Sequence, residues 1–135
     1  SSVLNMIIAQ RLVRKICQSC IYSYDADPGV AATVEEQLKK SSVGGTMKTS
    51  VPTVLYRGKG CQACGGTGYR GRLGIYEILE IDDKIKALIT KPEFNLEDIR
   101  TQAAANGMVT MFEDGIRKVE LALTTLEEVL RVIRE

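Results

Sequence analysis

Apolar residues recur along the chain at spacings that predict mostly helices. In residues 2–16, the aliphatic side chains are spaced as on one helix face, with Ser1 or Ser2 as the N-cap. Residues 82–135 contain four further apolar stripes, each predicting one helix. We expect these four helices to share one core as a small bundle. Their stripes are Ile85, Leu88 and Ile89; Leu96, Ile99 and Ala103; Phe112, Ile116, Val119 and Leu123; and Leu126, Val129, Leu130 and Ile133.

Capping residues predict where these helices begin and end. Pro92 ends the first helix, and Asn95 and Gly107 bracket the second. Thr125 and Glu128 form a Thr-x-x-Glu capping box at the start of the fourth helix.

Two shorter segments, residues 54–57 and 73–79, predict strands. They flank a cysteine-containing turn, so we expect them to pair as an antiparallel hairpin with that turn at its tip. The predicted fold class is therefore α+β and mainly α: a small cysteine-bearing hairpin joined to a C-terminal helical bundle.

Residues 21–53 have the features of an insertion. Asp27–Pro28 predicts the start of a short helix, and residues 41–50 predict a loop. The remaining helix signals are a capping box of Thr33 and Glu36, with Val34 and Leu38 as apolar contacts.

All four cysteines lie in two Cys-x-x-Cys pairs, Cys17/Cys20 and Cys61/Cys64, with 40 residues between the pairs. Two thiolates of one tight turn can bind the same ion, and two such turns make a closed tetrahedral site without a water ligand. Gly65 follows the second pair at a point where a metal-binding turn favours positive φ. The sequence therefore predicts a structural Zn²⁺ site made of all four cysteines.

Other fates of the cysteines stay open at this point. Disulfides need an oxidising compartment, which nothing in the sequence indicates. Buried or reactive free thiols are a second alternative. A thioredoxin-like redox pair is disfavoured because no βαβ pattern surrounds either pair.

Composition excludes several classes of enzyme. The 135 residues contain no histidine, which removes Ser-His-Asp and Cys-His catalysis. The phosphate-binding motif GxxxxGK[ST] is also missing. Apolar residues make up 44% of the chain, yet no run approaches the ~20 residues of a membrane span. No signal peptide is recognisable, because the basic residues near the start follow the apolar stretch and do not precede it. The chain begins at Ser1 and not at Met, so we expect a piece of a longer protein.

The formal net charge of +1 conceals an asymmetry between the two halves of the chain. Residues 1–72 hold ten basic and four acidic side chains, whereas residues 73–135 hold eight and thirteen. The basic half suits an acidic partner or a neighbouring subunit, or is simply a solvated surface. Nucleic acid is disfavoured as a partner because aromatic residues are not interleaved with the basic ones.

Several sequence blocks resemble one known family in the same order along the chain. These blocks are IIAQRLVRKICQSC (7–20), CQACGGTGYRGRLGIYEIL (61–79), AAANGMVTMFEDGIRKV (103–119) and TTLEEVLRVIRE (124–135). Together they resemble the C-terminal region of the type II secretion and type IV pilus assembly ATPases. The resemblance covers nearly everything outside residues 21–54.

The resemblance carries implications about organisation and cofactors. It implies that residues 1–16 are the terminal helix of a motor core, residues 17–80 a tetracysteine subdomain with an insertion at 21–53, and residues 81–135 a C-terminal helical subdomain. It also implies Zn²⁺ at the four cysteines, with ATP and Mg²⁺ bound only by the parent protein. The nucleotide-binding motifs of the family lie upstream, so the resemblance implies a non-catalytic part of an ATPase.

The resemblance also implies partners and contact residues. The family forms hexameric rings in the cytoplasm, peripheral to the bacterial inner membrane, and works with a membrane platform and cytoplasmic assembly proteins. Matching the family blocks singles out side chains that could face a neighbouring subunit or the nucleotide site, although local packing is the alternative. These residues are Gln10, Arg11, Arg14, Arg70 and Arg72.

Two functions of other classes remain as alternatives. The segment CQACGGTG matches one Cys-x-x-Cys-x-Gly-x-Gly repeat of zinc-binding co-chaperones, which favours a chaperone-like module. A nucleic-acid-binding zinc ribbon is the second alternative and would show steep salt dependence. A cysteine-based oxidoreductase is a weaker third.

Overall fold

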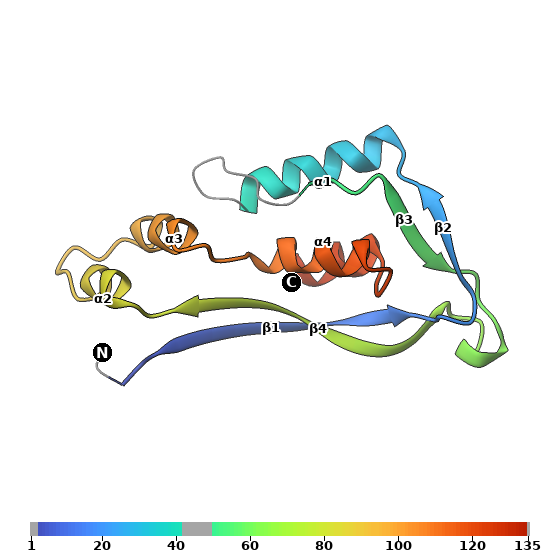
Figure 1. Ribbon diagram of the computed structural model, residues 1–135, viewed down its shortest axis with the longest axis horizontal. Helices are drawn as coiled ribbons and strands as arrows, with labels where there is room; N and C mark the ends of the chain where they lie inside the picture. The colour runs from blue at the N-terminus through green and yellow to red at the C-terminus, as the bar shows by residue number, and fades with distance from the viewer. Residues whose placement is uncertain (1–2, 42–49, 135) are drawn as a thin grey trace.

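The computed structural model describes residues 3–41 and 50–134 and has the predicted α+β fold (Figure 1). Within these described residues, two separate two-stranded antiparallel sheets are combined with five α-helices. In chain order, the elements are β1 (Met6–Ile16), β2 (Ile21–Asp25), α1 (Pro28–Ser41), β3 (Val54–Gly58), the 3₁₀ turn η2 (Gln62–Cys64), β4 (Tyr69–Glu80), α2 (Asp83–Ile89), α3 (Leu96–Ala105), α4 (Met111–Glu120) and α5 (Leu126–Ile133).

Strands β1 and β4 pair as a long antiparallel ribbon that runs along the molecule (Figure 1). The pairing runs from Met6 opposite Glu80 to Ile16 opposite Tyr69, with a register shift between Arg14 and Ile16. The helix predicted over residues 2–16 is therefore wrong, because this segment contains strand β1. Its helical spacing also fits an aliphatic strand, and pairing with a distant partner decides between the two.

The second ribbon pairs β2 with β3, from Ile21 opposite Gly58 to Asp25 opposite Val54. Both strands predicted around the second cysteine pair exist, but the predicted hairpin between them is wrong. β3 pairs with β2 and β4 pairs with β1, so the cysteine turn joins two different sheets. Strand β2, which lies within the segment interpreted as an insertion and was not predicted, is the partner of β3.

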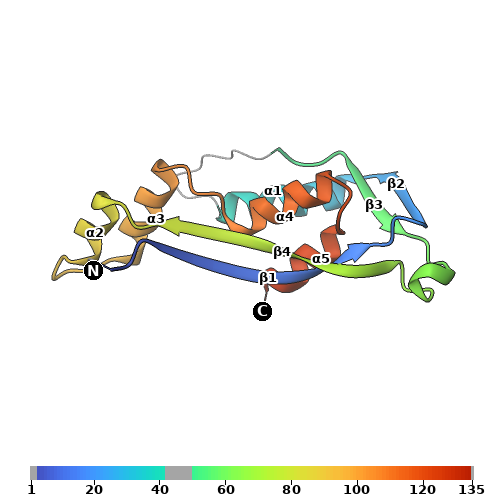
Figure 2. The same ribbon diagram turned by 60° about the horizontal axis from the view of Figure 1, so that its bottom comes forward.

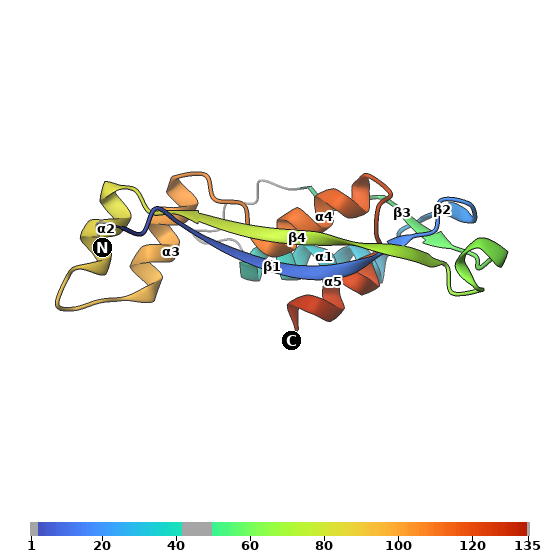
Figure 3. The same cartoon turned by 90° about the horizontal axis from the view of Figure 1, so that it is seen from below.

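The five helices lie in three places along the ribbon. Figures 2 and 3 show α4 and α5 beside the middle of the β1–β4 ribbon, and Figure 1 shows α1 on the side of α4 that faces away from this ribbon. The pair α2 and α3 lies at the opposite end of the ribbon from β2 and β3 (Figure 1). No helix in the described part of the chain is long and apolar enough to cross a membrane.

The four C-terminal helices do not share one core. Phe112, Ile116 and Val129, from α4 and α5, pack in a cluster that also receives residues of α1 and β3. Ile85 and Ile99, from α2 and α3, belong to a separate cluster. The shared-core expectation is wrong because the β1–β4 ribbon holds the two helix pairs apart.

The insertion forms the predicted helix from different capping interactions. The side chain of Asp27 accepts the Val30 N–H at 2.8 Å, which fixes the helix start. Thr33 lies inside α1 and donates to the Gly29 carbonyl, so the Thr33–Glu36 capping box is wrong. The predicted contacts of Val34 and Leu38 are confirmed, since both are buried. Most of the loop predicted over 41–50 lies outside the described residues.

The predicted ends of the C-terminal helices agree closely with the structure. The Asn95 side chain caps α3 by accepting the Glu97 N–H, and Thr125 caps α5 by accepting the Glu128 N–H. Gly107 follows α3 with a left-handed φ of 91°, as a helix-ending glycine should. Leu123, predicted as part of the third helix, lies in the turn after α4.

Candidate metal centre

The four cysteines gather where the two ribbons meet. Cys17 and Cys20 lie between β1 and β2, and Cys61 and Cys64 lie between β3 and β4. Each pair therefore sits in a crossing from one ribbon to the other, at the right-hand end of Figure 1. This topology brings together pairs that are 40 residues apart in sequence.

The sulfur atoms form a compact cluster. The distances are 3.7 Å from Cys17 to Cys61, 3.9 Å from Cys20 to Cys64 and 3.8 Å from Cys61 to Cys64. All four sulfur atoms lie within 4.8 Å of one another, and all four residues are free cysteines. The predicted site residues thus come together in a group that could hold one metal ion.

Backbone N–H groups point at two of the sulfur atoms. Cys61 and Gly68 each donate to the sulfur of Cys64 at 3.2 Å, and Gly60 donates to that of Cys20 at 3.4 Å. The hydrogen bond from Cys61 lowers the pKa of Cys64 to about 6, whereas burial raises the pKa of Cys20 to about 11. The turn that contains Cys61 and Cys64 therefore favours the thiolate form of Cys64.

Glycines let the backbone chains approach closely beside the cysteines. A Cβ atom on Gly68, whose φ is 81°, would lie 2.6 Å from the Gly58 carbonyl oxygen. Gly65 ends η2 with a left-handed φ of 65°, which confirms the turn predicted after Cys64. The glycine-rich sequence of the second pair therefore reflects this close crossing of β3 and β4.

Arg14 is held within its own chain. Its backbone N–H and its guanidinium donate to the two carboxylate oxygens of Glu128 at 2.8 and 3.1 Å. The guanidinium also stacks over the ring of Tyr69, 4.0 Å from the centroid. Sequence reasoning treated Glu128 only as a helix-capping residue, and no local pattern links it to an arginine 114 positions away.

The other predicted contact residues do not gather into one site. Gln10 lies on β1 and donates to the Tyr76 hydroxyl at 3.3 Å. Arg11 is exposed on the same strand, opposite Ile75. Arg70 and Arg72 are exposed on β4 near the cysteines, and Arg72 is the register partner of Arg14.

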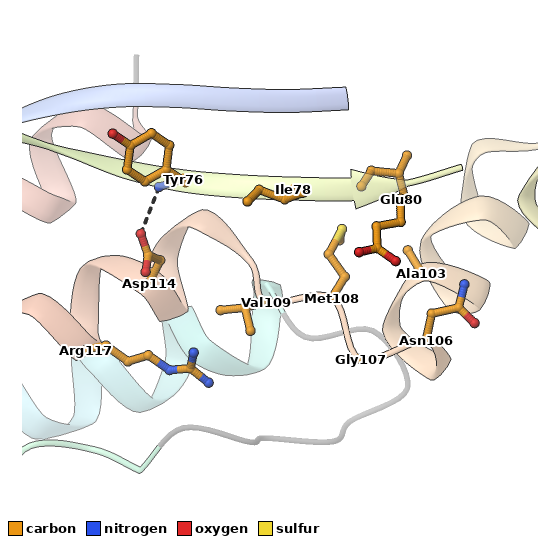
Figure 4. Close-up of a pocket in the computed structure, with 11 residues that line it drawn as sticks. Tyr76, Ile78, Glu80, Ala103, Asn106, Gly107, Met108, Val109, Asp114 and Arg117 are labelled. Atoms are coloured by element: carbon orange, nitrogen blue, oxygen red, sulfur yellow. Dashed lines mark hydrogen bonds between the residues drawn. The ribbon is translucent and has the colours of Figure 1, made fainter. Parts of the chain in front are cut away.

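A groove of about 420 Å³ lies between the two helix pairs, away from the cysteines (Figure 4). Ile78 of β4 and Val109 before α4 form part of its apolar lining, and Glu80, Asp114 and Arg117 add charge. The Asp114 carboxylate accepts the backbone N–H of Tyr76 at 2.8 Å. This groove was not predicted from the sequence, because its lining comes from three separate segments.

Fold and site together define an α+β protein with a tetracysteine cluster at the junction of two β ribbons. The model of one family, the type II/IV secretion system proteins, matches residues 1–131. The chain belongs to this family, which confirms the resemblance found in the sequence blocks.

Curated relatives carry the names of secretion and pilus assembly ATPases. The type IV pilus assembly ATPase PilB of Thermus thermophilus is 38% identical over 96% of this chain and 14% of its own length. The type II secretion system protein E of Pseudomonas aeruginosa is 38% identical over the whole chain and 24% of its own length. Protein HxcR of the same species is 40% identical over 96% of the chain and 21% of its own length. The chain thus spans less than a quarter of these relatives.

Proposed function

We propose that this chain is a non-catalytic, zinc-stabilised contact module of a hexameric ATPase that powers type II secretion or type IV pilus assembly. The observation that carries the proposal is the tetracysteine cluster within a chain of the matching family. The module would work in the cytoplasm at the inner membrane, contacting neighbouring subunits, the membrane platform and cytoplasmic assembly proteins. ATP and Mg²⁺ would bind the parent protein only.

The sulfur geometry supports zinc as the ion. A tetrahedron with Zn–S bonds of ~2.3 Å has edges of about 3.8 Å, which matches the sulfur distances of 3.7, 3.8 and 3.9 Å. Cys17, Cys20, Cys61 and Cys64 would supply all four ligands, leaving no open position for a substrate. Binding would contribute on the order of 10–16 kcal/mol to holding the two ribbons together.

The surface of the β1–β4 ribbon supports a contact role. Ile8, Leu12 and Ile78 are 58%, 47% and 44% exposed, although all three are large and aliphatic. Concentrated apolar exposure of this kind is typical of a protein interaction surface. Arg70 and Arg72 lie exposed beside it, and their guanidinium groups suit carboxylates or phosphates of a neighbouring subunit.

Residue types support the non-catalytic part of the proposal. The sequence lacks histidine and the GxxxxGK[ST] motif, so it has no lysine-bearing loop to cradle phosphates. The relatives named as ATPases extend well beyond the matched region. Nucleotide chemistry would therefore belong to the other parts of the parent protein.

Native mass spectrometry of the purified protein tests the metal site. We expect a mass excess of one Zn²⁺ per chain that is lost on acid denaturation, when four free thiols become titratable. Cys61→Ser should abolish tight zinc binding, whereas Gln62→Ala, an exposed change in the same turn, should retain it. A protein that stays folded, metal-free and unable to rebind zinc would contradict the proposal.

A hydrolysis assay on the same preparation tests the absence of catalysis. We expect no ATP turnover above background, because the phosphate-binding loop is missing. ATP turnover that co-purifies with the protein and survives removal of trace contaminants would contradict the non-catalytic assignment.

A further inference from the structure

Several hydrogen bonds join the end of β1, beside Cys17, to the turn between α4 and α5. At the end of β1, the Ile16 N–H donates to the Leu123 carbonyl at 2.9 Å. Next to it, the buried Thr124 hydroxyl donates to the Arg14 carbonyl at 2.7 Å. The Gln18 side chain donates to the Ala122 carbonyl at 3.3 Å.

The other strand of the ribbon contacts the same region. The Tyr69 hydroxyl and the Thr125 hydroxyl lie 2.9 Å apart, and Thr125 is also the N-cap of α5. Tyr69 directly follows Gly68, whose N–H donates to the Cys64 sulfur and whose carbonyl accepts from Cys17. One peptide unit therefore separates a sulfur-binding backbone group from a contact to the helix cap.

These contacts depend on a shared backbone arrangement. Ile16 donates to the helix turn, and the next residue, Cys17, donates to the cysteine turn. The end of β1 and the start of β4 must therefore keep their relative position for both sets of hydrogen bonds to exist. A ligand that fixes this relative position lowers the entropy cost of forming the contacts to the turn between α4 and α5. Conversely, these contacts lower the entropy cost of binding the ligand.

We propose that metal binding at the four cysteines and docking of the segment 122–133 stabilise each other, with Tyr69 and Thr124 as positioning residues. The proposal rests on the proposed metal site and adds that this site is coupled to residues 122–133. Metal occupancy would set the order of the C-terminal helix α5, whose first residue, Leu126, lies four positions after Ala122.

Zinc affinity measured by chelator competition gives the first test. In the 135-residue protein, Tyr69→Phe and Thr124→Val each delete one hydroxyl and keep the apolar body of the side chain. We expect each to weaken zinc binding about two- to tenfold, the factor that corresponds to one lost hydrogen bond. The matched control is Ile85→Val, which weakens the separate α2–α3 cluster and should leave zinc affinity unchanged.

Amide hydrogen exchange of the wild-type protein gives the second test. Removal of zinc should increase exchange within 122–133 and leave the amides of α2 and α3 unaffected. Normal zinc affinity in both folded variants, or exchange in 122–133 that ignores zinc, would overturn the coupling while leaving the metal site intact. If a variant fails to fold, the wild-type exchange result decides. Wild-type protein that binds no zinc would instead remove the metal site itself.

Discussion

Glu128 is a buried carboxylate in contact with two arginines. Its side chain is 2% exposed, and its oxygens accept hydrogen bonds from Arg14 and Arg131. Burial raises the pKa of this carboxyl, but the hydrogen bonds from Arg131 and Arg14 outweigh burial and lower it to about 2. The carboxylate therefore ties β1 to α5 as a charged group.

Replacing this carboxylate should destabilise the protein in a pH-dependent manner. We expect Glu128→Gln to cost about 2 kcal/mol at pH 7, because the charge-assisted hydrogen bonds from Arg14 and Arg131 are weakened within a buried site. The folded pKa of about 2 lies below the ordinary carboxyl value of 4.5, so the stabilisation is complete above pH 4.5. It should disappear as the pH falls from about 5 towards 2.

Urea unfolding of wild type and variant at each pH, at equal metal content, measures this difference. Glu120→Gln, an exposed change at the end of α4, is the matched control and should shift stability by less than ~0.5 kcal/mol. A difference between wild type and Glu128→Gln that stays constant from pH 7 to pH 3 would contradict this account.

At the scale of elements, local signals predicted the helices better than the strands. Caps such as Asn95 and Thr125 act within three residues, so the sequence shows them directly. The pairing of β1 with β4 joins residues more than 50 positions apart, and no local signal specifies it. The cysteine cluster was predictable because its spacing encodes chemistry rather than pairing, even though the predicted hairpin around it was wrong.

The crossing of β3 and β4 offers a matched pair of glycine substitutions. Gly66 and Gly68 have nearly the same left-handed φ, 84° and 81°. An added Cβ would meet nothing within 4 Å at Gly66, but at Gly68 it would lie 2.6 Å from the Gly58 oxygen. We expect Gly66→Ala to cost about 1–2 kcal/mol from backbone strain alone.

Gly68→Ala should cost a further ~1–3 kcal/mol, because the backbone of β3 has to move away. It should also weaken zinc binding, since the Gly68 N–H donates to the Cys64 sulfur. Thermal unfolding and zinc titration of the two variants measure both effects. Equal losses for Gly66→Ala and Gly68→Ala would show that close packing at the crossing is unimportant.

At the scale of the whole molecule, buried and exposed apolar side chains are divided between the two faces of the β1–β4 ribbon. Val13 and Ile75 are fully buried where α5 and the start of α4 cover the sheet, and they pack with Val132. Towards the α2–α3 end, Ile8 and Ile78 are register partners that both remain exposed. Because successive side chains of a strand point to opposite faces, Val13 and Ile75 lie on the face that the helices cover, whereas Ile8 and Ile78 lie on the opposite face and form an apolar surface there.

This division predicts two different outcomes for the same type of substitution. Ile75→Ser should destabilise the protein by about 3 kcal/mol or more, because it leaves a cavity and an additional hydroxyl in the core. Ile8→Ser should change stability by less than ~0.5 kcal/mol. Because an exposed apolar face favours association between chains, Ile8→Ser should also reduce self-association. Sedimentation velocity over a concentration series checks this, and unchanged association of the folded Ile8→Ser variant would show that the exposed face does not mediate contacts between molecules.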